Sequence, residues 1–196
     1  MGAVVDLSVG RHPPETSVRR NLGFVVFLGL LLLGTLLRCH TAIRADTLLA
    51  NEARTRETLA TLFGVSQAIT RSGTRHPGLR GEVLAAVPEL QPLPELSSEQ
   101  ISYAQDDLYI YGAATRTVTE AQTSSTRQGF VLRAWPLSFG STGDFEFQLS
   151  DDGALWQGQN LLGRSGTSVA FPPRFPEPTL GNPDEAWWIV PLPGHR

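Results

Sequence analysis

The feature that most constrains this chain is an uncharged, apolar run near its N-terminus, residues 21–37. Arg19 and Arg20 precede the run, and Arg38 follows it. As a helix, at about 1.5 Å per residue, the run covers roughly 25 Å, slightly less than the ~30 Å hydrocarbon core of a bilayer. A helix in a globular core keeps a polar stripe, which this run lacks. The run therefore predicts a membrane-embedded helix over residues 21–38.

A cleaved signal peptide is the main alternative for this run. Secretory signals carry an apolar region of about 7–15 residues followed by a small-x-small cleavage site. Here the run is at the long end and closes on "LLRCHTA". Lipidation of Cys39, the only cysteine, is disfavoured because Arg38 stands where a bacterial lipobox has a small residue. We therefore expect a retained anchor.

Residues 1–20 are predicted to be a cytoplasmic tail or a removable leader. They contain "RHPPE" and little apolar content, which is typical of a segment without a core of its own. Three arginines precede the apolar run and two follow it before residue 46, so the positive-inside bias favours a cytoplasmic N-terminus by a small margin. Residues 39–196 hold the only foldable domain and would then lie outside the cytoplasm.

The helix-forming pattern continues beyond the apolar run. Residues 41–71 contain no proline and one glycine, and Ala, Leu, Glu and Arg dominate them. Apolar residues recur there at spacings of three and four, at Leu59, Leu62, Phe63 and Ile69. We predict one rod that ends near Gly73 and Pro77, apolar all round in its first half and amphipathic in its second. Two helices with a break at residues 39–41 are the alternative.

Alternating strand patterns fill much of the remaining chain. Strands are predicted over residues 107–114, 130–138 and 144–150, with a short one from 154 and a last one within 185–193. Residues 116–129 are expected to be a polar loop, and residues from 163 onward a Pro-rich tail. In the third strand Phe145, Phe147 and Leu149 alternate with Glu146 and Gln148, which predicts one apolar and one polar face. The fold class is therefore α+β, a long N-terminal helix whose amphipathic half packs on a small antiparallel β-sheet.

The chain carries no recognisable pattern of catalytic or ligand-binding residues. With 16 basic and 19 acidic residues its net charge is −3, so no nucleic-acid partner is expected. The four histidines, at 12, 40, 76 and 195, lack metal-ligand spacing, and neither a phosphate-binding loop nor a nucleophile elbow is present. The sequence predicts a protein that is not an enzyme and that has no catalytic residue, cofactor or metal site.

Two segments, in this order, carry a resemblance to a known family. The first is "ANEA" at residues 50–53 in the second half of the rod, and the second is "GFVLRAWPLSFGSTGDFEFQLSDDG" at 129–153. Together with the apolar N-terminal helix, they resemble type IV pilins and the pseudopilins of type II secretion. The resemblance implies a pilin-like fold in the bacterial inner membrane, with a single span and an extracytoplasmic C-terminal domain. It also implies partners: the lipid bilayer, and other pilin-like subunits or secretion components that pack through the N-terminal helix.

The resemblance also implies a processing site. Prepilins are cut after a glycine that precedes a phenylalanine, and Gly23-Phe24 follows the basic pair at 19 and 20. The family places a Glu at the fifth mature position, where this chain has Leu28. The expected function is therefore a minor or atypical structural component of a secretion or pilus-type assembly. The alternative is a stand-alone anchored envelope domain that binds a partner or ligand and does not polymerise.

Major pseudopilins bind calcium in a C-terminal loop, so the resemblance raises the question of a cation site. Oxygen donors of the right type occur here at Asp151, Asp152, Asn182, Asp184 and Glu185. They stand in turn-like contexts, where Asp and Asn side chains are common because they hydrogen-bond to nearby backbone groups. We therefore predict no calcium site.

Overall fold

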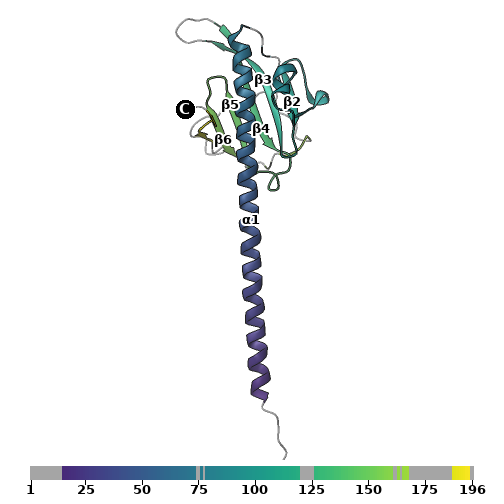
Figure 1. Cartoon of the computed structure of the whole chain (residues 1–196), viewed down its shortest axis with the longest axis vertical. Helices are drawn as coiled ribbons and strands as arrows, with labels where there is room; N and C mark the ends of the chain where they lie inside the picture. Colours follow the sequence, from purple (N-terminus) through teal and green to yellow (C-terminus); the bar gives the residue numbers. More distant parts are fainter. Residues whose placement is uncertain are drawn as a thin grey trace, which may run out of the picture. The chain divides into compact units, whose positions relative to one another are not determined.

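The structure is a computed structural model that describes residues 15–73, 76, 78–119, 126–160, 163, 165–167 and 187–194. The chain divides into two compact units, Met1–Ala45 and Asp46–Arg196, and each is described by itself. The described elements are α1 (Glu15–Arg71), α2 (Gly81–Ala85), the 3-10 helix η1 (Pro94–Leu96) and the strands β1 (Gln91–Pro92), β2 (Ile101–Gln105), β3 (Tyr109–Thr119), β4 (Thr126–Pro136), β5 (Phe145–Ser150), β6 (Leu155–Gln159) and β7 (Trp187–Val190) (Figure 1).

Helix α1 is continuous from Glu15 to Arg71, so the predicted single helix is confirmed and the break expected by the alternative is absent from residues 39–41. The helix begins within residues 1–20, earlier than the predicted start at residue 21. It ends where the sequence predicts, because Gly73 adopts a positive φ of 78°, the left-handed conformation that terminates many helices. Pro77, the other predicted stop, lies outside the described residues.

The described strands form one seven-stranded antiparallel sheet in the order β1 to β7, so each strand lies beside its predecessor in sequence. The predicted meander is thereby confirmed. Short turns join β2 to β3 and β5 to β6, and Gly153, with φ of 88°, closes the turn between β5 and β6. Local connections of this kind need no crossover helix, which leaves one face of the sheet available for α1.

The core lies between the sheet and the second half of α1 (Figure 1). Leu59, Leu62 and Phe63 of α1 are buried there, as their spacing predicts. Opposite them lie inward residues of the strands: Tyr109, Tyr111, Phe130, Leu132, Phe147, Leu149 and Leu155. The α+β class and the packing of a long helix on an antiparallel sheet are confirmed.

Strands β1 and β2 and the facing ends of β3 and β4 were not expected from the sequence. Strand β2 occupies residues 101–105, for which no strand was predicted. The predicted polar loop at 116–129 is wrong at both ends, because β3 continues to Thr119 and β4 starts at Thr126. The physical reason is β-propensity: Thr115, Thr117 and Thr119 alternate along β3, and β-branched threonine suits a strand although it is polar.

The second face of the sheet differs from the polar, solvated face that the alternation suggests. Glu146 and Gln148 do lie opposite the apolar residues of β5, but both are buried. At one end of this face Leu93, beside η1, packs with Tyr103, Ile110 and Trp135 in a second, smaller core. The sheet therefore buries side chains on both faces.

Candidate functional site

The apolar first part of α1 presents its side chains to the surroundings on every side. All of its large apolar residues from Leu22 to Leu37 are between 48% and 67% exposed. Among the described residues, α1 is the one helix that is long and apolar enough to cross a membrane. The hydroxyl of Thr35 lies within hydrogen-bond distance of the carbonyl oxygens of Leu31 (3.1 Å) and Leu32 (2.8 Å) and donates to them. In a lipid environment this hydroxyl would therefore not be an unsatisfied donor.

The candidate processing residues lie on this part of α1. Gly23 and Phe24 are consecutive helical residues, and the phenylalanine side chain is exposed. Leu28, where the resembled family has a Glu, follows about one helical turn later and is also exposed. Cys39 and His40 are exposed on the same helix. The side chains of Phe24 and Leu28 are therefore accessible on one apolar helix.

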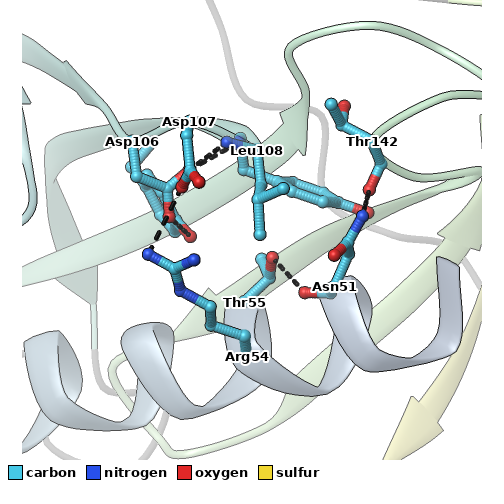
Figure 2. Close-up of polar contacts among 9 residues, drawn as sticks. Asn51, Arg54, Thr55, Asp106, Asp107, Leu108 and Thr142 are labelled. Carbon is cyan, nitrogen blue, oxygen red and sulfur yellow. Dashed lines mark hydrogen bonds and ion pairs between the residues drawn. The ribbon is translucent and has the colours of Figure 1, made fainter. Parts of the chain in front are cut away.

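The second part of α1 is joined to the sheet by polar side chains as well as by the core. Asn51 Nδ2 donates to the carbonyl oxygen of Thr142 at 3.0 Å, and the hydroxyl of Thr55 donates to the carbonyl oxygen of Asn51 at 2.9 Å (Figure 2). Glu52 is buried and accepts a hydrogen bond from the backbone N–H of Asp144. The "ANEA" segment thus contacts the Gly-rich turn at 140–144, so the two segments that carry the family resemblance touch each other.

Burial raises the pKa of the Glu52 carboxyl above its usual value. The cause is loss of hydration, which disfavours the charged form, and the nearby Asp144 carboxylate adds to it. The N–H of Asp144 and the Arg56 guanidinium act in the opposite direction. Glu52 is therefore an acid placed where its negative charge is costly.

Asp106 organises the start of β3 beneath α1. Its Oδ1 accepts from the N–H groups of Leu108 (2.8 Å) and Tyr109 (2.6 Å), and its Oδ2 accepts from the Tyr111 hydroxyl at 3.1 Å. Burial raises the pKa of both tyrosine hydroxyls, so they stay protonated donors. At the exposed rim Arg54 pairs with Asp107 at 3.3 Å (Figure 2). The role of this cluster is to hold the sheet against the helix.

A buried Ser–His pair lies at the end of the helix–sheet interface. His76 Nδ1 accepts from the N–H of Gly78 at 3.0 Å, so in the neutral ring Nε2 carries the proton and donates to Ser66 Oγ at 2.7 Å. Burial lowers the pKa of His76 to about 4, and its ring stacks on Phe130 with centroids 4.8 Å apart. Because Nε2 is already protonated, it cannot accept the serine proton as a general base would. The pair links a loop to α1.

A buried ion pair lies on the face of the sheet away from α1. Arg133 of β4 pairs with Glu146 of β5, and both side chains are almost completely buried. The ring of Trp187 in β7 lies 5.9 Å from the Arg133 guanidinium and packs against Gly158, where a Cβ would come within 2.5 Å of it. Gln148, opposite Arg133 in the register, leaves its buried Oε1 without a hydrogen-bond partner. The sequence did not reveal this cluster, although an arginine inside "FVLRAW" is a signal that could have found it.

Of the two described donors of the calcium candidate, Asp152 serves the turn itself. Asp152 Oδ1 accepts from the N–H of Ala154 at 3.0 Å, which is the backbone role expected for it, and Asp151 is buried beside it. Asn182, Asp184 and Glu185 lie outside the described residues. Within the described part of the chain, no three His, Cys, Asp or Glu side chains are grouped as metal ligands.

Comparison with known proteins adds no assignment, since no protein-family profile, no curated protein and no solved structure matches this chain.

Proposed function

We propose that this protein is a membrane-anchored, pilin-like structural protein, a minor or atypical component of a bacterial secretion or pilus-type assembly. The observation that carries the proposal is α1 itself. Its first part exposes apolar side chains all round, and its second part packs on an antiparallel sheet. An apolar surface of that kind is stable in lipid or against other apolar helices, and costly in water.

The role of the first part of α1 follows from the same surface. In the inner membrane it would be the single span and would pack beside the apolar helices of other subunits. The domain that begins near residue 46 would then stand outside the cytoplasm. The function is structural, since the polar clusters of that domain act as interior and interface contacts.

A second candidate function is favoured by one residue, Leu28. A Glu at that place would be a charge in the membrane that needs a partner, and its absence removes one reason for neighbouring subunits to associate. The alternative is an anchored envelope domain that binds a partner or ligand and does not polymerise.

Mass spectrometry of the protein extracted from bacterial membranes distinguishes the two candidates. A mature chain that starts at Phe24 is expected for the assembly component, and a Gly23→Leu variant should then keep its leader. Crosslinking in the membrane should also yield a ladder of higher-order species. A chain that starts at Met1 or Gly2 and yields no higher-order species would contradict the assembly role and support the stand-alone domain.

A further inference from the structure

The two longest strands of the sheet extend beyond their neighbours. Strands β3 and β4 pair over their full length, from Tyr109 opposite Pro136 to Thr119 opposite Thr126. Strand β2 pairs with residues 110–114 of β3, and β5 pairs with residues 131–134 of β4. Residues 115–119 and 126–130 therefore form a two-stranded ribbon, called here the β3–β4 ribbon.

The hydrogen-bond pattern shows which backbone groups face outward from this ribbon. On β3, the carbonyl of Tyr109 accepts from the N–H of Asp106, and the N–H of Thr115 donates to Gln100 at 3.2 Å, so odd-numbered residues point away from β4. By the same alternation, Thr117 and Thr119 direct their N–H and C=O groups away from β4. Among the described residues no strand lies there to pair with them.

The β4 side of the ribbon has the complementary arrangement. The N–H of Leu137 donates to Leu108 of the β3 side, while the carbonyl of Pro136 accepts from Gly166 on the other side. Even-numbered residues of β4 thus point away from β3, which gives Thr126 and Gln128 outward N–H and C=O groups. Each edge of the ribbon presents two residues with unpaired backbone groups, within the described part of the chain.

The ribbon lacks two of the devices that protect sheet edges, a bulge and a proline. Its register is continuous, without a bulge, and its ten residues include no proline. The side chains of Thr117, Thr126 and Gln128 are exposed, so these three bury little surface, whereas Phe130 at the base of the ribbon lies in the core. A two-stranded ribbon with so little burial is marginally stable alone and gains stability from a third strand.

The charge of the ribbon residues indicates which kind of partner strand would pair with the ribbon edge. In sequence, the ten ribbon residues include Arg116 and Arg127 and no acidic residue. The stretch 115–130, which adds Glu120, has two basic residues and one acidic residue. This local excess is positive although the chain as a whole has a net charge of −3. Cross-strand pairs of opposite charge and of β-branched residues stabilise sheets by roughly 0.2–1 kcal/mol each.

We infer that the β3–β4 ribbon is a docking site for an extended, acidic segment of a partner protein, which adds a strand to one of its edges. Main-chain hydrogen bonds to Thr117 and Thr119, or to Thr126 and Gln128, supply the affinity of such strand addition. The two arginines supply the preference for acidic sequence. This inference concerns the domain and does not depend on how α1 is anchored.

Amide hydrogen exchange of the full chain in detergent micelles tests the inference. The probe is a short synthetic peptide that alternates threonine or valine with glutamate, and the comparison peptide has lysine in place of glutamate. With the acidic peptide at up to about 1 mM, exchange at one pair of outward amides should slow by at least about tenfold. No slowing, or equal slowing by the lysine peptide, overturns the inference.

Proline substitutions identify the edge. Thr117→Pro and Gln128→Pro each remove one outward N–H without removing a bond between β3 and β4. One of them should abolish protection by the peptide, while the matched variants Thr117→Val and Gln128→Thr, which keep the N–H, should retain it. If a proline variant does not fold, N-methylation of alternate peptide amides removes the same bonds from the other partner. Protection that survives the proline variants and the N-methylated peptide overturns strand addition.

Discussion

At the scale of single residues, the domain holds two ionisable side chains whose burial has opposite consequences for stability. His76 is kept neutral, with its pKa lowered to about 4, because the charged ring would lose hydration inside the domain. Glu52 has its pKa raised for the same reason, since an acid is charged when deprotonated and a histidine when protonated. The unfolding free energy therefore depends on pH through both side chains, in opposite directions.

The stability that His76 contributes should be lost in acid. In the unfolded chain the His76 ring has the usual pKa of 6.5 and binds a proton below that pH. In the folded protein the ring stays neutral down to about pH 4. The unfolding free energy should therefore fall as pH drops from 6.5 to 4, by about 2–3 kcal/mol. Chemical denaturation of the full chain in micelles across this range measures the fall. In His76→Phe, which keeps the stacking on Phe130, this part of the pH dependence should vanish; its persistence would contradict the assignment.

Glu52→Gln should stabilise the domain at neutral pH. The folded state holds the Glu52 proton more tightly than the unfolded state, so its contribution is favourable below pH 4.5 and is lost as pH rises through the raised pKa. A neutral glutamine avoids the buried charge and can still accept a hydrogen bond from the N–H of Asp144, which should raise the unfolding free energy at pH 7. Thermal melting checks the gain. The exposed, same-helix variant Glu57→Gln should leave stability unchanged, and a loss in Glu52→Gln would refute the prediction.

At the scale of elements, β4 and β5 are coupled through charge as well as through backbone pairing. The Arg133–Glu146 pair is buried, and its neighbours Trp187 and Gln148 extend the cluster to β7 and across the β4–β5 register. The second face of the sheet thus depends on residues from three strands. An ion pair excluded from water differs from an exposed one, because either partner left alone would be an uncompensated charge.

Breaking the buried pair should cost far more than breaking an exposed one. Glu146→Gln leaves the Arg133 charge buried and should lower the unfolding free energy by about 3–5 kcal/mol. Asp107→Asn, which breaks the exposed pair with Arg54, should change it by less than about 1 kcal/mol. Denaturant titration measures both. The double variant Arg133→Met/Glu146→Leu should recover much of the loss, and equal effects of the two single variants would show that burial does not govern the pair.

At the scale of the whole chain, the division near residue 46 separates two kinds of surface. Before it, large apolar side chains of α1 are exposed. After it, Leu59, Leu62 and Phe63 of α1 are buried in a core. The sequence predicted this change from an all-round apolar run to an amphipathic one. The meander and the helix cover were also predictable, because strand alternation and helix spacing are local patterns.

Two leucines of α1 provide a matched test of the membrane span. Leu30 and Leu49 are similarly exposed, at 64% and 61%, but only Leu30 lies in the predicted span. Leu30→Arg should oppose membrane insertion by about 2.5–3.5 kcal/mol, whereas Leu49→Arg should have little effect. The fraction of chain that remains in membranes after alkaline carbonate extraction checks this. Equal retention of both variants would argue against a span at residues 21–38.

The rest of the molecule could not be predicted because it depends on residues that are distant in sequence. The contact of Asn51 with Thr142 joins positions far apart in the chain, and nothing local to "ANEA" indicates which turn it meets. The Ser66–His76 bond and the Arg133–Glu146 pair likewise form only when separate elements pack. Polarity limited the prediction in two places. It concealed the strand character of residues 116–119, and it gave no sign that Glu146, on the polar face, is buried.

The sequence by itself determined the long helix, the apolar N-terminal run and the antiparallel α+β class, since each follows from the spacing of apolar residues along a short stretch. The tertiary structure alone decided which polar groups are buried and how they are paired. It alone placed the ends of β3 and β4 beyond the other strands that the structure describes. Burial sets whether a charge is stabilised by water or by a partner, and burial is a property of the packed chain. For that reason the sequence predicts the elements of this protein, while its buried charges and its open sheet edge depend on the fold.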